Sequence, residues 1–113
     1  MTRVLSAAVA TLNTIVLVDK YPPADERVLA KQTTRAVGGP ATTAAVTMAR
    51  LGIDVSLACV IGDDEAGRYI FDTLKREGVD TKNVQIDPNT TTAIGTIIAV
   101  SYTHLTLPTS DLV

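Results

Sequence analysis

Residues 37–64 read VGGPATTAAVTMARLGIDVSLACVIGDD and carry the clearest structural signals of the chain. Gly38 and Gly39 leave one point of the backbone without side chains, so another group can approach the main chain closely there. Pro40 fits the first turn of a helix. The predicted helix places small apolar residues on one buried face: Ala41, Ala44, Ala45, Met48 and Ala49. Gly52 fits the left-handed position after the helix end.

The residues that follow predict a buried strand over 53–61, closed by Gly62-Asp63-Asp64. The free amide groups and the positive dipole at the start of a helix, behind Gly38-Gly39, suit the polar oxygens of a ligand. A Gly-Gly-Pro sequence before a helix is also a common tight turn, so the residues alone leave both interpretations open.

Three segments of this stretch together resemble the N-terminal signature of the ribokinase-like (PfkB) carbohydrate kinases: Gly38-Gly39-Pro40-Ala41-Thr42-Thr43-Ala44, Leu51-Gly52, and Ile61-Gly62-Asp63-Asp64-Glu65-Ala66-Gly67. The resemblance continues upstream in residues 12–22, which look like the ketohexokinase-like members, and downstream in LKREGVDT at residues 74–81. It covers roughly residues 3–99 in family order, which is far more specific than a glycine motif alone.

Strands and helices alternate along the chain, which predicts the α/β class with a mainly parallel sheet and packed helices. We expect a buried parallel strand over 3–12, extended by 15–18, one or two strands within 28–36, and strands at 84–86 and 92–100. The resemblance implies the N-terminal part of a ribokinase-like fold, in which parts of 15–18, 28–36 and 92–100 form a small β lid.

A second helix is predicted over 65–77 and ends at Gly78. Its buried face would carry Ala66, Ile70, Phe71 and Leu74. Its outer face would hold ion pairs of Asp72 with Arg68 and with Arg76, at i, i+4 spacing.

Composition excludes several classes of function. The 113 residues have a net charge of −2 and no basic stripe, which argues against nucleic-acid binding. No apolar run is long enough to span a bilayer, and the apolar N-terminus fits a first strand better than a signal peptide. The single Cys59 cannot form an internal disulfide and fits a small core residue better than a reactive thiol. We therefore expect a cytoplasmic protein without nucleic-acid or membrane partners.

The character of the sequence changes near Val100. Residues 100–105, VSYTHL, can be encoded by a transposase mosaic end used in sequencing libraries, and the following residues fit the adjoining adapter. We therefore predict that residues 1–99 are the N-terminal part of a truncated PfkB-type kinase domain and that residues 100–113 are a non-native tail. An ordinary Thr/Leu-rich tail is the alternative. His104, the only histidine, lies in this tail and receives no role.

By resemblance, the candidate substrate-binding residues are Asn13, Gly38, Gly39 and Thr43. Asn13 takes the place, at the end of the first strand, of an aspartate that binds two sugar hydroxyls in the family. Thr43 takes the place of the family's usual asparagine. Asn13 could instead cap the strand end, and the Thr43 hydroxyl could instead bond a backbone carbonyl. Gly38 and Gly39 would let the backbone approach the substrate.

The resemblance implies an ATP-dependent sugar kinase with Mg²⁺, which transfers the γ-phosphate to a sugar hydroxymethyl group. The family's catalytic aspartate lies in a late Gly-Ala-Gly-Asp segment that this sequence lacks, so the chain would hold only the sugar-binding half and no catalytic, nucleotide-binding or metal-binding residue. For Asp63 and Asp64, an N-cap at Asp64 is a better interpretation than a metal site.

The predicted ligand is a sugar or a nucleoside, and the longer parent protein could form a homodimer through its lid edges. One alternative is a non-catalytic sugar- or nucleoside-binding module, and another is a nucleoside kinase of the same fold. A dinucleotide-binding domain fits poorly, because no Gly-x-Gly-x-x-Gly follows the first strand.

Overall fold

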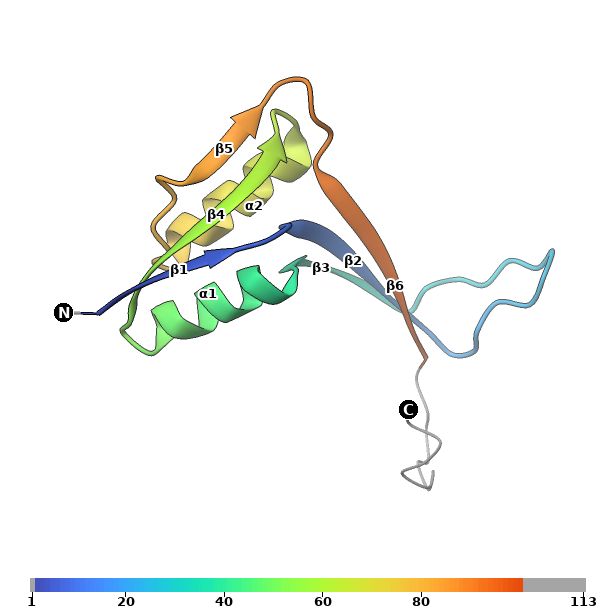
Figure 1. Cartoon of the computed structure of the whole chain (residues 1–113). Coiled ribbons are helices and arrows are strands. Elements are labelled where there is room, and N and C mark those ends of the chain that lie inside the picture. Colours follow the sequence, from blue (N-terminus) through green and yellow to red (C-terminus); the bar gives the residue numbers. More distant parts are fainter. Residues whose placement is uncertain (1, 101–113) are drawn as a thin grey trace.

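The computed structural model describes residues 2–100, so His104 and all of the predicted tail except Val100 lie outside the described residues. The elements follow in the order β1 (Arg3–Ala7), β2 (Thr11–Val18), β3 (Gln32–Gly38), α1 (Pro40–Arg50), β4 (Asp54–Gly62), α2 (Glu65–Arg76), β5 (Val84–Asp87) and β6 (Ala93–Val100). They form two three-stranded sheets, which we call the body sheet, β1-β4-β5, and the lid, β3-β2-β6. Figure 1 shows the lid extending away from the body.

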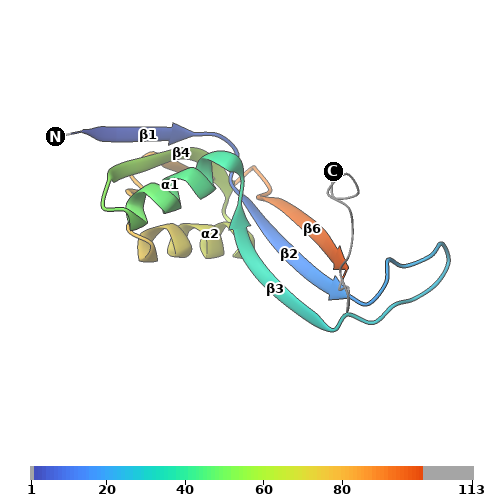
Figure 2. The ribbon, with the colours of Figure 1, turned by 90° about the horizontal axis from the view of Figure 1, so that it is seen from below.

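The body sheet is entirely parallel, and both helices cover one of its faces (Figure 2). Strand β4 alternates in burial, as expected for a strand with one covered face. Its inward side chains Val55, Leu57, Cys59 and Ile61 are buried and pack with Ala45 of α1 and with Ile70 and Leu74 of α2. This cluster is the core of the described chain, and it confirms the predicted α/β class.

The lid combines two kinds of pairing around its central strand β2. Strand β3 runs antiparallel to β2, with Thr11 opposite Gly38, whereas β6 runs parallel to β2, with Thr11 opposite Ala93. All three predicted lid segments are therefore present. The sheet is longer than predicted, because β2 begins at Thr11 and β3 extends to Gly38.

The single strand predicted over 3–12 is wrong, because the chain forms two strands there that belong to different sheets. Pairing with β4 follows β1 through Ala7, and the Ala8 N–H still donates to the Ala58 carbonyl oxygen at 3.3 Å. From Thr11 the chain pairs with β3 and β6 instead. Asn13 consequently lies inside the lid strand β2 and not at the end of a body strand, so the strand-end cap is excluded.

The predicted helices are present, with one difference in the buried face of α1. Pro40 occupies its first turn, and Gly52 after its end has a φ of 85°. Thr42 is buried and Ala44 is exposed, so the buried face is turned relative to the predicted one. In α2 the apolar face is as predicted, and Gly78 follows its end with a φ of 87°.

The two ion pairs predicted along α2 are wrong. Arg68 lies 3.7 Å from Asp63, which precedes the helix, and Arg76 donates to the Thr73 hydroxyl at 3.4 Å. Both arginines are exposed. Exposed side chains of this kind have several partners of similar energy within reach, so helical spacing alone does not select one.

Replacing Leu57 tests the core. Leu57 is fully buried in β4, so Leu57→Ala should lower the free energy of unfolding by about 2–5 kcal/mol through the lost burial and the remaining cavity. Urea unfolding of the 113-residue chain measures the change. Leu51→Ala, at a residue that is 73% exposed, is the control and should change the free energy of unfolding by less than about 0.5 kcal/mol. Equal effects of the two variants would contradict this core.

The N-cap of α2 predicts a pH dependence of stability. Hydrogen bonds from the Thr92 hydroxyl, the Thr92 N–H and the Gly67 N–H hold the pKa of the Asp64 carboxyl below its ordinary value. A lowered folded-state pKa stabilises the fold above the ordinary pKa of about 3.9, and this stabilisation disappears as pH falls through the lowered value.

The difference in stability between the natural chain and Asp64→Ser should therefore be largest near neutral pH and should shrink below about pH 4. Urea unfolding at a series of pH values measures it. Asp72→Ser, on the exposed face of the same helix, is the control. A difference that stays constant from pH 7 to pH 3 would show that the Asp64 carboxylate has no such role.

Candidate functional site

Asn13 lies in a slot that two glycines leave open on one face of the lid. In the register of the sheet it stands between Ala36 of β3 and Gly95 of β6. A Cβ atom added to Gly95 would lie 2.7 Å from Asn13 Oδ1, and one added to Gly38 would collide with Asn13 Nδ2. The amide group therefore occupies space that any side chain at residues 38 or 95 would fill.

The Asn13 amide is half-buried and makes no hydrogen bond to another of residues 2–100. An asparagine amide offers two donors and one acceptor oxygen. A half-buried amide without a protein partner is favourable only if water or a ligand satisfies it. The slot can therefore bind a small polar ligand through hydrogen bonds without contributing a charge.

Gly39 has a packing reason of its own. Its φ of 103° lies in the region that favours glycine, and a Cβ there would collide with the Val9 carbonyl oxygen. The Gly39 carbonyl oxygen accepts the first hydrogen bond of α1, from the Thr43 N–H at 2.9 Å. Gly39 thus lets α1 start directly behind the link between β1 and β2, and this packing accounts for the glycine without a ligand.

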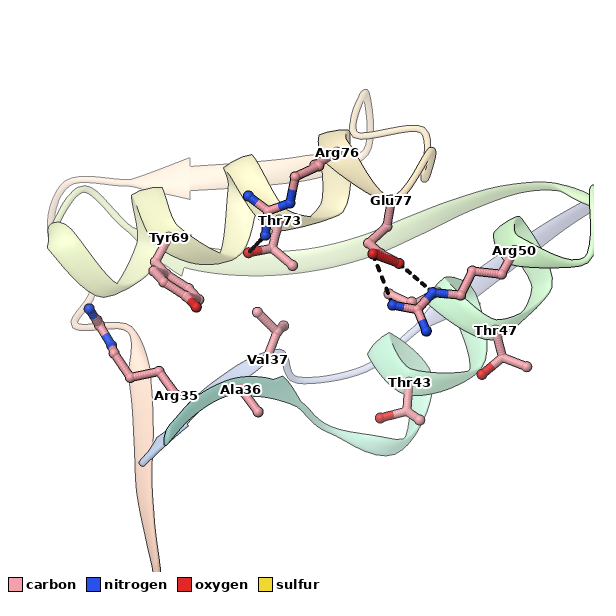
Figure 3. Close-up of a pocket in the computed structure, with 11 residues that line it drawn as sticks. Arg35, Ala36, Val37, Thr43, Thr47, Arg50, Tyr69, Thr73, Arg76 and Glu77 are labelled. Carbon is pink, nitrogen blue, oxygen red and sulfur yellow. Dashed lines mark hydrogen bonds and ion pairs between the residues drawn. The ribbon is translucent and has the colours of Figure 1, made fainter. Parts of the chain in front are cut away.

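Thr43 is exposed in the first turn of α1 and lines a groove of about 360 Å³ (Figure 3). The groove lies between α1, α2 and β3, and its polar lining comprises Arg35, Thr43, Thr47, Arg50, Tyr69, Thr73, Arg76 and Glu77. The Thr43 hydroxyl bonds no backbone carbonyl of residues 2–100. The structure thus brings Asn13 and Gly38 together and places Thr43 beside a different set of side chains.

Two bidentate ion pairs hold most of the charge at this groove. Arg50 donates to both oxygens of Glu77 at 2.6 and 2.9 Å, and Arg35 donates to both oxygens of Glu65 at 2.9 Å. The Arg35 guanidinium also lies 4.5 Å from the centre of the Tyr69 ring. These hydrogen bonds from arginine hold the pKa values of Glu65 and Glu77 below their ordinary range. Both arginines are therefore neutralised by protein carboxylates.

Asp64 and Cys59 have structural roles. The N-cap predicted at Asp64 is confirmed, since its Oδ1 accepts from the Gly67 N–H at 2.8 Å. Cys59 is buried, and burial raises the pKa of its thiol. Between residues 2 and 100, no three His, Cys, Asp or Glu side chains gather closely enough to hold a metal ion. No helix in the same range is both long and apolar enough to cross a membrane.

A sequence model of the pfkB family carbohydrate kinases matches residues 1–107. The chain belongs to this family. It is 37% identical over 86 residues to a ribokinase of Bacillus subtilis, covering 76% of this chain and 29% of that protein. It is 34% identical over 76 residues to a 5-dehydro-2-deoxygluconokinase of Geobacillus thermodenitrificans, covering 67% of this chain and 21% of that protein.

Solved structures agree with this assignment. A fructokinase of Halothermothrix orenii superposes with a TM-score of 0.74 at 27% identity, over 88% of this chain and 34% of that one. A ribokinase of Cryptococcus neoformans, in complex with ADP, superposes with a TM-score of 0.78 at 24% identity, over 89% and 32%, and supports the fold alone. The chain thus has a ribokinase-like fold and spans between a fifth and about a third of the length of these four proteins.

Filling the slot tests its geometry. Gly38→Ala should displace the Asn13 amide and lower the free energy of unfolding by about 1–3 kcal/mol, because the added Cβ collides with Nδ2. The NMR signals of the Asn13 side-chain amide and urea unfolding measure the two effects. Thr34→Ala, at an exposed residue of the same strand, is the control. If Gly38→Ala leaves the Asn13 signals where Thr34→Ala leaves them, the slot is not formed by Gly38.

Proposed function

We propose that the chain is the sugar-binding part of an ATP-dependent kinase that phosphorylates a sugar hydroxymethyl group. The observation that carries this proposal is the Asn13 amide, which lacks a protein partner in residues 2–100 and is flanked by Gly38 and Gly95. Family membership supports the reaction class, since a model of carbohydrate kinases matches the chain.

In this proposal each candidate residue has a distinct part. Asn13 would donate to and accept from sugar hydroxyls, and Gly38 would let the sugar reach the backbone of β3. Gly39 would hold the start of α1 near the ligand. The first backbone N–H groups of that helix have no intrahelical acceptor and would be available to the ligand. Thr43 would contact the sugar only if the ligand reached the first turn of α1.

ATP and Mg²⁺ would be bound by other parts of a longer parent protein. The described residues provide neither a cluster of metal ligands nor the late Gly-Ala-Gly-Asp segment that the family resemblance implies, so no catalytic step is assigned to them. The 113-residue chain itself should not turn over ATP. In the parent, exposed edges of the lid would offer a surface for a second subunit, and the protein would work in the cytoplasm.

A second candidate is a binding module without catalysis, or a nucleoside kinase of the same fold. The neutral Asn13, where the family usually has an aspartate, favours the binding module. An aminoimidazole riboside kinase of Salmonella typhimurium is 30% identical over 79 residues, and this similarity supports a nucleoside-like ligand as the alternative. Long-read sequencing of the source DNA across codon 100 separates a kinase, of either substrate class, from a binding module. A frame that continues into a late Gly-x-Gly-Asp supports the kinase, and a stop after codon 113 supports the binding module.

Calorimetry tests the sugar site directly. Ribose and fructose are titrated into the 113-residue chain and into any longer parent protein. Asn13→Ala should weaken sugar binding at least about tenfold, because it removes hydrogen bonds made by the free amide. Asn13→Asp keeps the shape and the acceptor oxygen, replaces the NH2 donors by a second acceptor, and should retain binding. Thr34→Ala serves as the control. Binding that survives Asn13→Ala unchanged would remove Asn13 from the site.

A further inference from the structure

The carboxylate of Asp64 joins the body to the lid. Its Oδ1 accepts from the Thr92 hydroxyl at 2.6 Å and its Oδ2 accepts from the Thr92 N–H at 3.0 Å, while Oδ1 also caps α2 through Gly67. Thr92 is 3% exposed and immediately precedes β6. One side chain therefore fixes both the start of a body helix and the start of a lid strand. Hydrogen bonds to a carboxylate are among the stronger ones in proteins.

Two glycines make this junction sterically possible. The Thr92 hydroxyl accepts from the Gly62 N–H at 2.8 Å, which closes the network around the end of β4. A Cβ on Gly62 would lie 3.0 Å from the Thr92 nitrogen, and one on Gly67 would lie 2.9 Å from Thr92 Oγ1. The segment Gly62-Asp63-Asp64-Glu65-Ala66-Gly67 thus has the spacing that receives Thr92, a role that its sequence alone does not reveal.

The position of Thr92 matters for the slot around Asn13. Thr92 is three residues before Gly95, which lies opposite Asn13 in the parallel pairing of β6 with β2. A slip of β6 by one residue would place Ile94 or Thr96 opposite Asn13 and turn every side chain of β6 to the other face. Only a residue without a side chain fits there, since a Cβ would lie 2.7 Å from Asn13 Oδ1.

The other polar contact between lid and body is weaker. Arg35 of β3 and Glu65 of α2 form a bidentate pair, but their side chains are 40% and 67% exposed. Exposed ion pairs of this kind contribute little to stability. Leu12 of β2 is buried in the core cluster and joins the near end of the lid to the body, whereas the Thr92 contact is the buried polar contact at the start of β6 and can hold that strand in register.

We propose that Asp64 and Thr92 are positioning residues for the sugar site, which hold β6 in the register that keeps Gly95 beside Asn13. That the ligand is a sugar rests on the function proposed above, whereas the positioning of β6 by Asp64 and Thr92 is a property of this chain. Its test uses no sugar. A natural chain that binds no sugar would therefore refute the proposed function and leave the positioning unaffected.

Hydrogen exchange by NMR on the 113-residue chain provides the test. Thr92→Val keeps the shape of the side chain but removes the hydroxyl that donates to Asp64 and accepts from Gly62. The amides of β6 that donate to β2 should then exchange about tenfold faster than in the natural chain, while amides of β1 and β4 change much less. Thr92→Ser restores the hydroxyl and should return the exchange of β6 to within about twofold of the natural rate.

Val79→Ala is the control for general destabilisation, because Val79 is buried in the body. It should accelerate exchange of the slowest amides of the body and leave β6 no more affected than β4. If Thr92→Val changes both sheets in the pattern of Val79→Ala, the junction only adds stability and the positioning role is refuted. If Thr92→Ser behaves like Thr92→Val, the hydroxyl is not what holds β6.

Asp64→Asn keeps the proposal testable if Thr92→Val does not fold. Its Oδ1 can still cap Gly67, but its amide nitrogen cannot accept from the Thr92 N–H. The Gly67 amide should stay protected, β6 should exchange faster, and the nuclear Overhauser effect between the Asn13 side-chain amide and the Gly95 α-protons should weaken several-fold. An unchanged effect between Asn13 and Gly95 would overturn the inference.

Discussion

The apolar face of β4 is the constraint on which the rest of the structure depends. Its inward residues, among them Leu57 and Ile61, are fully buried under both helices. The strands pair in parallel in the order β1-β4-β5, and α1 and α2 lie on the same face of this sheet (Figure 2). The strand then ends at Gly62, so burial in the body also determines where the chain turns through Asp64 into α2.

The lid is held in a different way. Its strands are joined across β2 by backbone pairing, and side chains such as those of Ile94 and Ile98 on β6 are 72% and 40% exposed. Apolar contact with the body comes from the near end of the lid, where Leu12 of β2 is buried in the core cluster and Val37 of β3 packs against it. Its placement relies on this apolar contact, on the chain connections and on polar contacts, of which the Asp64–Thr92 junction is buried and the Arg35–Glu65 pair is exposed.

Local signals in the sequence sufficed for the parts of the fold that depend on local physics. Pro40, Gly52 and the N-cap at Asp64 marked the helix ends correctly, because turn and cap geometry involve only neighbouring residues. The split between β1 and β2 was missed, since an apolar β-branched run looks the same in either sheet. The Arg35–Glu65 pair was missed as well, because it joins residues 30 positions apart in different elements.

At the site, too, signals within one segment of sequence were informative, whereas contacts between residues far apart in sequence were not predicted. The family resemblance directed attention to Asn13 and Gly38, but nothing in it pointed to Gly95, the other wall of the slot. A lone glycine within the β-rich run 92–100 was the available signal, since glycine inside a strand often marks a close approach. In the proposed sugar site, a neutral amide between two glycines would select ligands by hydrogen-bond direction and not by charge. A sugar hydroxyl both donates and accepts, so it can pair with either end of the Asn13 amide, whereas a carboxylate ligand could use only the nitrogen end.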